Sequence, residues 1–524
     1  MSGIFGAAGS NPREVEDALR TMRHRGALIK SGSAGPFVVA SISDDPGDFF
    51  SGSTLVAALA GTCFGDDGRM TAEAFARHYQ KAGALDFSNH SGHFALAIAD
   101  GAHDRLILYR DAVGIAPLHV GRGDGRIIFA SEYKAILAIT RKPEIDTQAV
   151  SGFLKTGWTP PGRTFLETIR PVPAGHVCHF RQDQAICNHR SSRRVEKTEK
   201  PADPVQAVAG LLRNSVDRMS TECDATEAGL MLSGGVDSAL IGGLLKQTLP
   251  GKTLRSYTVG YGDDDPEIQG ARDTADTLGF QHTEIFLKPA DFDRLMPKAV
   301  AAMENLGGHD EYPCLLAAHE AAFGKIDVMF SGNLSDTLFA GMNEHRQIWE
   351  RGDAGSRGGS KDGMLLSAAL HKSLMVRDER LSAQEMFAAR FGLSARMPYA
   401  DPDLISLALG LPDSCKVSAQ RNKIVLRDVA ARTLPLSIAN RPKGIQQLRY
   451  DEVLRDWLLY RLSLATNNLV KTELPFTHSQ INAVRDELRS HITTQTVHAA
   501  WNVVAVDFWI REFVQSAHHD LTVT

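Results

Sequence analysis

The segment Leu232–Ser238, with the sequence LSGGVDS, has the residue types and the spacing of an anion-binding loop. Its two adjacent glycines allow a tight turn, and a helix that begins at the end of the loop would direct free N–H groups toward a phosphate. The hydroxyls of Ser233 and Ser238 add hydrogen-bond donors. Asp237 would repel a phosphate unless a bridging Mg²⁺ reverses the local charge. The segment therefore predicts a site for a nucleotide phosphate and its metal ion.

A second aspartate, Asp336, lies in the segment FSGNLSDTLFAG at residues 330–341, directly after the apolar run IDVMF. Carboxyl ends of parallel strands meet at one edge of a sheet, so two loops that follow such strands can share one ion. Carboxylate oxygens are the protein ligands that Mg²⁺ prefers. Two aspartates on neighbouring loops of this kind are what a metal–pyrophosphate site needs.

The pattern of apolar runs indicates the elements that must position these loops. AGLML at 228–232, TLRSYTVG at 253–260 and IDVMFSG at 326–332 are short apolar runs that predict strands. Segments with helical spacing alternate with them, which indicates a parallel α/β sheet. The chain after residue 360 has mainly helical patterns.

The first part of the chain has a different texture. Runs at 94–100, 105–111 and 126–132 are apolar and separated by Gly and Asp turns, which is typical of β-rich structure with hairpins. A polar stretch follows at 188–204. We expect one domain over residues 1–190 and a second over residues 203–524.

Composition sets wider limits on function. The chain has 524 residues, a formal net charge of −5, 43% hydrophobic residues and 23% charged residues, which excludes a disordered chain and a small disulfide scaffold. Its mild acidity argues against a nucleic-acid partner, and the sequence has neither a membrane-spanning apolar run nor a secretory signal. Six widely spaced cysteines without metal-site spacing predict reduced thiols and a cytoplasmic protein.

The motifs of the second domain resemble those of asparagine synthetases and β-lactam synthetases. LSGGVDS is similar to the SGGxDS pyrophosphate loop of this family, and FSGNLSDTLFAG is similar to its SGxGSDExFGGY segment. Residues 392–404, 423–435 and 441–446 are similar to three further family segments. The resemblance implies an ATP pyrophosphatase fold (adenine nucleotide α-hydrolase-like) with extra helices, and ATP and Mg²⁺ as cofactors.

The resemblance also implies roles for individual residues. The adenosine site would comprise Leu232, Val259, Ser331 and Gly332. The pyrophosphate site would comprise Ser233, Gly234, Gly235 and Ser238, and the Mg²⁺ ligands would be Asp237 and Asp336. Lys443 falls on the family lysine that contacts the nucleotide phosphate and the reacting acyl centre, and Glu304 is a candidate for a substrate or amine contact.

The first domain is similar to the glutamine amidotransferase domain of asparagine synthetases. Residues 91–120 and 127–136 match its LxGxFAxAxxD, RDxxGxxPLY and FASExKAL segments. The resemblance implies an Ntn-type αββα sandwich. The whole chain is thus expected to combine α+β and α/β domains.

The amidotransferase motifs are incomplete at the positions that matter for glutamine hydrolysis. Ser2 stands where the family has its N-terminal nucleophilic cysteine, and a serine hydroxyl has essentially no anionic form at neutral pH without a paired base. Ala27 and Leu28 replace the Pro-Asp of HRGPD, and GTCFG at 61–65 stands in place of NGEIYN. We expect that glutamine hydrolysis is lost and that this domain remains as a structural partner.

A synthetase without a glutaminase must take its amine from elsewhere. The leading hypothesis is ring closure of an amino-carboxylate through an acyl-adenylate, as in β-lactam synthetases of specialised metabolism, with release of AMP and pyrophosphate. Intermolecular amide ligation, ammonia-dependent amidation and a catalytically silent nucleotide-binding paralogue are the alternatives. A homodimer stays open.

The general base is not carried over from either family. Asn333 occupies the position of the family Glu or Tyr and is neutral, so it cannot accept a proton at neutral pH. Glu385 lies near the segment that supplies a base in β-lactam synthetases, but the spacing predicts an exposed helix carboxylate instead.

Overall fold

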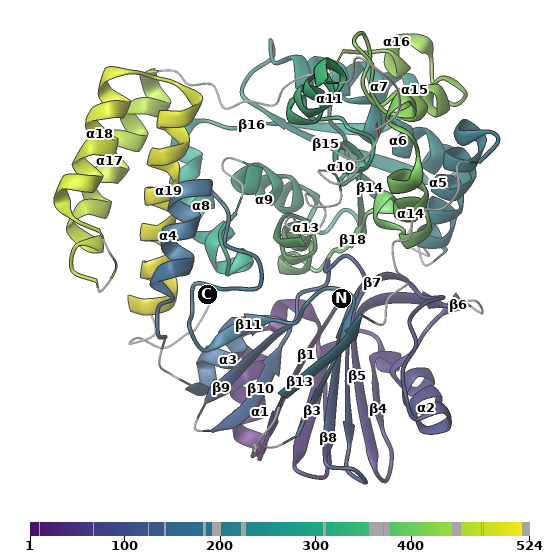
Figure 1. The fold of residues 1–524 in the computed structure, drawn as a ribbon, viewed down its shortest axis with the longest axis vertical. Helices are drawn as coiled ribbons and strands as arrows, with labels where there is room; N and C mark the ends of the chain where they lie inside the picture. The colour runs from purple at the N-terminus through teal and green to yellow at the C-terminus, as the bar shows by residue number, and fades with distance from the viewer. Residues whose placement is uncertain are drawn as a thin grey trace.

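A computed structural model describes residues 1–9, 11–65, 68–123, 125–140, 143–181, 185–190, 201–221, 227–307, 311–355, 370, 378–442, 452–472, 474 and 476–515. Two antiparallel sheets form the part that begins at the N-terminus, and a parallel sheet surrounded by helices forms the rest (Figure 1). Among these residues, no helix combines the length and the apolarity that crossing a membrane would require.

The two antiparallel sheets pack face to face. The first has the order β11 (Ile169–Pro171), β9 (His119–Gly123), β10 (Arg126–Ala130), β1 (Ser2–Ala8), β3 (Phe37–Ser43), β2 (Leu28–Ala34). The second has the order β13 (Ala185–Arg190), β12 (His176–Phe180), β8 (Arg105–Arg110), β7 (Ser91–Asp100), β5 (Leu55–Gly65), β4 (Phe49–Ser51), and β6 (Gly68–Arg69) pairs with β5.

Alternation along β1 explains why both of its faces are buried. Ile4 and Ala8 belong to the cluster between the two sheets, whereas Phe5 and Ala7 belong to the cluster on the opposite face. Helices α1 (Pro12–Arg20) and α3 (Tyr133–Thr140) cover that outer face, and α2 (Ala72–Ala82) covers the outer face of the second sheet. The αββα sandwich expected from the sequence is therefore present.

Four cysteines have side chains that the structure describes, and one of these four is disulfide-bonded. Cys63, Cys314 and Cys415 form no disulfide bond, and the first two are buried. Cys178 is disulfide-bonded and lies opposite Cys187 in the register of β12 and β13. The prediction of reduced thiols throughout the chain is therefore wrong for Cys178, whose place in the register of two paired strands the spacing of the cysteines does not show.

The parallel sheet positions the candidate site. Its order is β16 (Gln281–Phe286), β15 (Thr253–Gly260), β14 (Glu227–Met231), β17 (Val328–Ser331), β18 (Ser394–Arg396). The three strands predicted from apolar runs are β14, β15 and β17. From β14 the chain first adds strands on one side of the sheet and later on the other, so β14 and β17 flank a topological switch point, where α/β proteins bind ligands.

Helices surround this sheet. They are α5 (Pro204–Ser220), α6 (Val236–Thr248), α7 (Pro266–Leu278), α8 (Pro289–Met303), α9 (Glu311–Ala322), α10 (Ser335–Leu338), α11 (Asn343–Gly355), α13 (Asp378–Arg390), α14 (Pro402–Gly410), α15 (Ile424–Ala431) and α16 (Leu436–Ala439). Helices α6 and α7 connect strands that extend the sheet in one direction, while α8 and α9 lie in the connection that crosses back to β17. Right-handed crossovers place these two pairs on opposite faces.

Three helices near the C-terminal end of the described residues form a further layer. It consists of α17 (Glu452–Leu469), α18 (His478–Ser490) and α19 (Thr494–Ile510), and α4 (Thr147–Thr156) of the N-terminal part packs against α19 (Figure 1). Trp501 and Trp509 of α19 are buried. The Nε1 of Trp509 donates to the hydroxyl oxygen of Tyr133 at 2.8 Å, which links this layer to α3. The two halves therefore share a continuous buried interface.

Candidate active site

The loop between β14 and α6 forms the first wall of the site. Strand β14 ends at Met231 and α6 begins at Val236, so the loop lies at the carboxyl end of a central strand. Gly235 is the N-cap residue of α6 and has no side chain that could cap the helix. The N–H groups of the first turn and the positive end of the helix dipole are therefore available to an anion.

Hydroxyl groups within this loop hold its shape. Ser238 Oγ accepts a hydrogen bond from the N–H of Ser233 at 3.0 Å and lies 3.0 Å from Ser233 Oγ. The N–H of Gly235 donates to Ser233 Oγ at 3.2 Å. The loop thus holds its shape through its own hydrogen bonds, which reduces the ordering cost of binding a ligand.

Gly234 faces helix α7. Its N–H donates to Glu267 Oε2 at 2.8 Å, and a Cβ on Gly234 would lie 3.2 Å from backbone atoms of Glu267. Arg441 Nη1 donates to the carbonyl oxygens of Gly234 at 3.1 Å and Gly270 at 2.6 Å. A side chain at position 234 would therefore crowd the backbone of α7, and a carboxylate already occupies the N–H of Gly234.

The loop between β17 and α10 forms the second wall. Strand β17 ends at Ser331 and α10 begins at Ser335. A Cβ on Gly332 would lie 2.9 Å from the backbone nitrogen of Ser238, so glycine is needed for the two loops to touch. Leu334 adopts a φ of 79°, a left-handed conformation that is rare for a non-glycine residue and that turns the chain into α10.

The two predicted metal ligands meet at a buried lysine. Lys423 Nζ pairs with Asp237 Oδ2 and lies 2.6 Å from Asp336 Oδ1, and its side chain is 4% exposed. Burial lowers the pKa of Lys423, but the carboxylates of Asp237 and Asp336 raise it by more, so the pKa lies above its usual value. The lysine is therefore charged and neutralises part of the repulsion between the two carboxylates.

In addition to pairing with Lys423, the carboxylates of Asp237 and Asp336 are suited to bind a Mg²⁺ ion. Asp237 Oδ1 is buried and has no hydrogen-bond partner among the described residues. It keeps its lone pairs for a cation, and carboxylate oxygens suit Mg²⁺. Gly341 provides the space that these side chains occupy, because a Cβ at this position would overlap the Asp336 carboxylate and the Lys423 side chain. Asp237 and Asp336 are thus the residues that would hold the ion.

Both loops open onto one pocket with a volume of about 390 Å³. This volume lies within the usual range for small-molecule sites. The residues predicted to bind the nucleotide that line it are Leu232, Ser233, Gly235, Asp237, Ser238, Val259, Ser331 and Gly332. Asp336 lines it as well, whereas Gly234 does not belong to the lining. The structure brings these residues together, and their ligand roles stay predictions.

Sequence reasoning assigned no role to Lys423, Arg427 and Gln384, which also line the pocket. Lys423 opens the segment 423–435, whose family resemblance was the available signal for it. Arg427 Nη1 donates to the carbonyl oxygens of Ala439 at 2.9 Å and Arg441 at 2.8 Å, so it supports the chain that leads toward residue 443. Gln384 carried no signal in the sequence, because only the packing of α13 brings it to the pocket.

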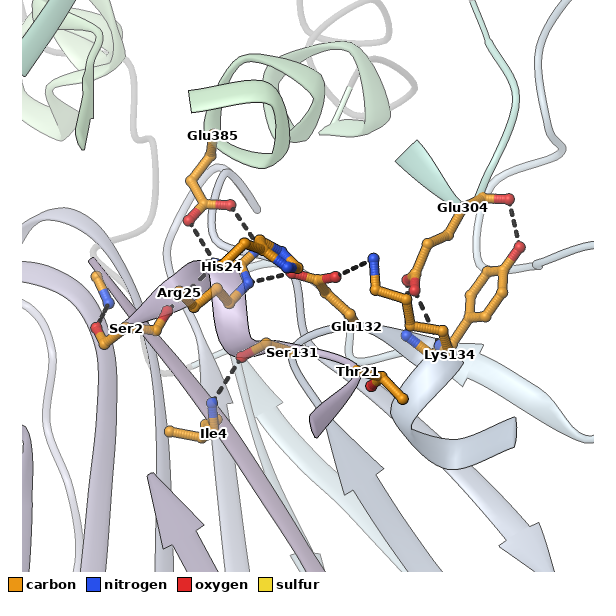
Figure 2. A network of polar contacts seen from close by, with 12 residues as sticks. Ser2, Ile4, Thr21, His24, Arg25, Ser131, Glu132, Lys134, Glu304 and Glu385 are labelled. Atoms are coloured by element: carbon orange, nitrogen blue, oxygen red, sulfur yellow. Dashed lines mark hydrogen bonds and ion pairs between the residues drawn. The ribbon is translucent and has the colours of Figure 1, made fainter. Parts of the chain in front are cut away.

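The two predicted catalytic residues are not in the described pocket. Lys443 lies outside the described residues. Glu304 is fully buried at the end of α8, where its carboxylate accepts hydrogen bonds from the N–H groups of Tyr133 at 2.6 Å and Lys134 at 2.9 Å (Figure 2). It caps the first turn of α3 in the other half of the molecule. The structure therefore corrects the assignment of Glu304 to a substrate contact.

The environment of Glu304 also perturbs its protonation. Burial raises the pKa of Glu304 to about 8, the ammonium of Lys134 lowers it in part, and the nearby carboxylate of Glu132 raises it. A perturbed carboxyl group is a common sign of an active site. Here the pKa is raised because Glu304 is buried in the interface between the two halves, so its shift is not a sign of catalysis.

Ser2 is the first residue of β1, a central strand of the first sheet. It is 2% exposed, and its Oγ accepts a hydrogen bond from the N–H of Gly61 at 2.8 Å. Burial raises the pKa of the neighbouring Asp48 to about 6, although the hydroxyls of Ser43 and Ser2 stabilise its ionised form. The hydroxyl of Ser2 has a structural partner in this position, and the predicted loss of glutamine hydrolysis stays a prediction.

Glu385 is not the exposed helix carboxylate that the sequence suggested. It is 7% exposed, and its Oε1 lies 2.9 Å from Nη1 of Arg25 (Figure 2). The correction comes from tertiary structure, because Arg25 belongs to the N-terminal sandwich and Glu385 belongs to α13. An ion pair between residues this far apart in the chain leaves no local pattern.

The fold and the two loops define a class of protein. A parallel α/β sheet with an anion-binding loop at its switch point, joined to an αββα sandwich, is the architecture of an ATP-dependent synthetase with an amidotransferase-like domain. Comparison with known proteins gives the family. The sequence model described as asparagine synthase matches residues 207–388 and 370–511, and the one described as glutamine amidotransferase domain matches residues 59–190. The chain belongs to the asparagine synthase family, whose members are ligases that form C–N bonds.

Individual relatives are distant. The chain is 23% identical over 513 residues to the glutamine-hydrolyzing asparagine synthetase 1 of Bacillus subtilis (strain 168), covering 83% of this chain and 79% of the relative. It is 24% identical over 483 residues to a putative glutamine-hydrolyzing asparagine synthetase of Mycobacterium bovis, covering 76% of this chain and 72% of the relative. Among solved structures, the glutamine phosphoribosylpyrophosphate amidotransferase of B. subtilis, with ADP and GMP, gives a TM-score of 0.27 at 13% identity, covering 64% of this chain and 77% of that one. That similarity is too low to support any inference.

Proposed function

We propose that this protein is an ATP- and Mg²⁺-dependent amide synthetase that activates a substrate carboxylate as an acyl-adenylate. The observation that carries the proposal is the meeting of Asp237, Asp336 and Lys423 beside the open N-terminus of α6. One helix end and one buried cation favour the oxygens of a pyrophosphate, and two carboxylates favour its metal ion. Membership of the asparagine synthase family is consistent with this chemistry.

The residues divide the work of the first step. Leu232, Val259, Ser331 and Gly332 seat the adenosine. Ser233, Gly235 and Ser238 hold the pyrophosphate group, with Gly234 shaping the loop. Asp237 and Asp336 hold Mg²⁺, which neutralises pyrophosphate oxygens when bound. A substrate carboxylate oxygen forms a bond to the α-phosphorus, and the bond from that phosphorus to the pyrophosphate oxygen breaks.

The second step forms the amide. An amine nitrogen bonds to the acyl carbon, the bond from that carbon to the AMP oxygen breaks, and the amine proton passes to water. Lys423 remains beside the departing phosphate and stabilises its charge, as preorganised cations do. Lys443 would add a second cation by family resemblance.

Ring closure within one amino-carboxylate substrate is the reaction that the described lining favours. Each carboxylate of that lining has one oxygen paired with a protein group, Asp237 and Asp336 with Lys423 and Glu267 with the N–H of Gly234. Asn333 in the lining is neutral. Proximity of two groups in one molecule can supply roughly 7–11 kcal/mol of the barrier, so cyclisation can proceed without a strong base. A β-lactam of specialised metabolism is an example of a product that such ring closure forms.

Ammonia-dependent amidation of an Asp-like acid is the second candidate, and the named relatives favour it. Both relatives are described as asparagine synthetases. Their glutamine-hydrolysing chemistry does not extend to a chain that has Ser2 in place of the family cysteine. Free ammonia, or another small amine, would then take the place of the glutamine nitrogen.

Pyrophosphate release tests the proposal. The purified chain is incubated with ATP, Mg²⁺ and a panel of amino diacids, with and without ammonium. We expect release with at least one acid, and Asp336→Ala should abolish it, whereas Ser2→Ala should leave turnover with an added amine unchanged. No release with any acid, together with no binding of ATP, would contradict the proposal, whereas binding of ATP without release would show a catalytically silent nucleotide-binding paralogue.

The mass of the product separates the two candidate reactions. Ring closure gives a product that is lighter than the acid by one water. Amidation gives a product that has exchanged its hydroxyl for an amino group from ammonia. Isotopically labelled ammonium enters the product only in the second case, so a labelled product contradicts cyclisation.

A further inference from the structure

Helix α13 contributes to the pocket and to the interface between the two halves of the molecule (Figure 1). Leu381 and Gln384, which are three residues apart, line the pocket. The next residues, Ser382 and Glu385, contact the N-terminal sandwich. Since neighbouring residues of an α-helix differ by about 100° in direction, the pocket face and the interface face of α13 adjoin over residues 381–385.

Glu385 is held by Arg25 through two hydrogen bonds. Arg25 Nη1 donates to Glu385 Oε1 at 2.9 Å, and Nη2 donates to Oε2 at 3.3 Å. Both side chains are almost fully buried, at 1% and 9% exposure. A paired arginine and carboxylate fix both position and rotation, because the planar guanidinium must face the carboxylate plane.

Arg25 is in turn fixed from behind by its own domain (Figure 2). Its Nε pairs with Glu132, and its Nη1 donates to the carbonyl oxygen of Ser2 at 3.2 Å. Glu132 also binds Lys134 Nζ at 2.5 Å and His24 Nε2 at 2.8 Å. The guanidinium therefore transmits the position of the sandwich to α13 with little freedom of its own.

A second anchor acts one turn earlier. Arg110 Nη2 donates to Ser382 Oγ at 3.0 Å, and Ser382 Oγ donates to the carbonyl oxygen of Gly114 at 2.9 Å. Arg110 and Gly114 both belong to the sandwich. Two anchors on one face of a helix fix its rotation about its axis, which a single contact would leave adjustable.

The pocket face of α13 carries a polar group whose direction matters. Gln384 is 2% exposed and lines the pocket. Its carboxamide offers both donors and an acceptor, so it can recognise a polar group of a bound molecule only when the helix is correctly rotated. A small rotation of α13 would remove it from the pocket wall, and a misplacement of about 1 Å can cost a large factor in activity.

We propose that Arg25 is a positioning residue of the synthetase pocket: through Glu385 it sets the rotation of α13 and thereby holds Gln384 against the bound substrates. The inference deepens the proposed function and rests on it for the identity of the ligand. The His24–Arg25–Gly26 segment resembles a motif of glutamine hydrolysis. In this chain it serves the other half of the molecule, which gives a sandwich without the family thiol a defined role in amide synthesis.

The test compares the full chain with Arg25→Gln, Gln384→Met, the double variant and a control. Hydrogen exchange of residues 381–390 reports the docking of α13, and calorimetry with Mg²⁺ and α,β-methylene ATP, which cannot release pyrophosphate, reports the pocket. The control, Arg163→Gln, removes an ion pair to Asp146, the N-cap residue of α4 in the N-terminal half, with a distance of 2.7 Å, that does not involve α13.

We expect Arg25→Gln to speed exchange of residues 381–390 by at least about fivefold and to weaken nucleotide binding by roughly tenfold. Gln384→Met should weaken binding without faster exchange. The double variant should bind no more weakly than Arg25→Gln alone, because both changes act on one contact. Arg163→Gln should match the wild type in both measurements. Arg25→Lys keeps the charge but loses the paired geometry. Its exchange rate and its nucleotide affinity should therefore lie between those of the wild type and those of Arg25→Gln.

Three results would overturn the positioning role. They are wild-type exchange and affinity in Arg25→Gln, faster exchange with unchanged affinity, and full additivity of Arg25→Gln with Gln384→Met. If Arg25→Gln does not fold, Arg25→Lys and Glu385→Gln are judged by the same criteria, since both preserve side-chain volume. A wild-type chain that binds no nucleotide contradicts the proposed function itself, whereas wild-type binding that survives these substitutions contradicts the positioning role alone.

Discussion

At the scale of single residues, the site depends on charges placed where water is scarce. Lys423 is buried between two carboxylates, and Asp237 Oδ1 has no partner among the described residues. Removing one member of such a buried cluster leaves the others uncompensated, which costs far more than the net stability of the intact cluster. The behaviour of variants at this site should therefore depend on whether another cation replaces the one removed.

Lys423→Met tests this dependence. Pyrophosphate release should fall by at least about 100-fold, because a preorganised cation beside the departing phosphate is lost. The melting temperature should also fall, and Mg²⁺ should restore more of it than in the wild type, since the ion can separate Asp237 from Asp336. Thermal unfolding with and without Mg²⁺ measures this effect. Lys246→Met, at an exposed position near the end of α6, is the control and should change neither quantity. Equal Mg²⁺ responses in wild type and Lys423→Met would contradict this account.

Glu304 should give the chain a stability that depends on pH. Its pKa rises from an ordinary value of 4.5 to about 8 on folding, so between these values the folded state binds more protons than the unfolded chain. Stability must then fall as pH rises through that window. Glu304→Gln should flatten this dependence between pH 5 and 8, measured by urea unfolding. Glu16→Gln, at an exposed residue, should keep the wild-type slope, and an unchanged slope in Glu304→Gln would refute the assignment.

At the scale of elements, the site is made by strand ends and by glycines that let loops approach. Strands β14 and β17 are neighbours in the sheet, and each leads into a helix at the same edge. Gly332 permits the contact between the two loops, and Gly341 leaves room for Asp336 and Lys423. Asp237, Asp336 and Lys423 can therefore approach one another only because positions 332 and 341 have no Cβ.

Alanine substitutions of two glycines test that statement. Gly341→Ala should displace Asp336 and Lys423, lower the free energy of unfolding by ~1–3 kcal/mol and reduce pyrophosphate release. Gly210→Ala is the matched control, because it lies within α5 and a Cβ there would meet no atom within 4 Å. It should stabilise the chain by ~0.5–1 kcal/mol through its helix preference. Urea unfolding and pyrophosphate assays of both variants decide the matter, and a stable, active Gly341→Ala protein would count against the site.

At the scale of the whole molecule, the two halves are joined by buried contacts over a wide area. Glu304 caps α3, Arg25 binds Glu385, and Trp509 binds Tyr133. Buried charges that lose their partners are costly, so separation of the halves would expose apolar surface and also leave unpaired ions. The sandwich is thus a structural component of the synthetase.

A cut chain should remain assembled. A specific protease site inserted between residues 190 and 201 allows cleavage after folding, because the two described halves end on either side of that segment. We expect both fragments to elute together in size-exclusion chromatography, with pyrophosphate release retained. The same cut in Arg25→Gln tests how much of the cohesion comes from that ion pair. Separation of the wild-type fragments under native conditions would show that the interface is weaker than its burial indicates.

Local pattern determined a large part of this protein. Apolar runs predicted β14, β15 and β17. The glycines and aspartates of Leu232–Ser238 and of residues 330–341 indicated the two loops, because short local sequence patterns determine turns and strand ends. The sequence could not place Glu385 and Glu304, since a carboxylate reads as exposed until its distant cation or N–H partner is known. It also gave no role to Lys423 or Gln384. Their function comes from packing between elements far apart in the chain, where burial decides which charge is paired and which side chain reaches the pocket.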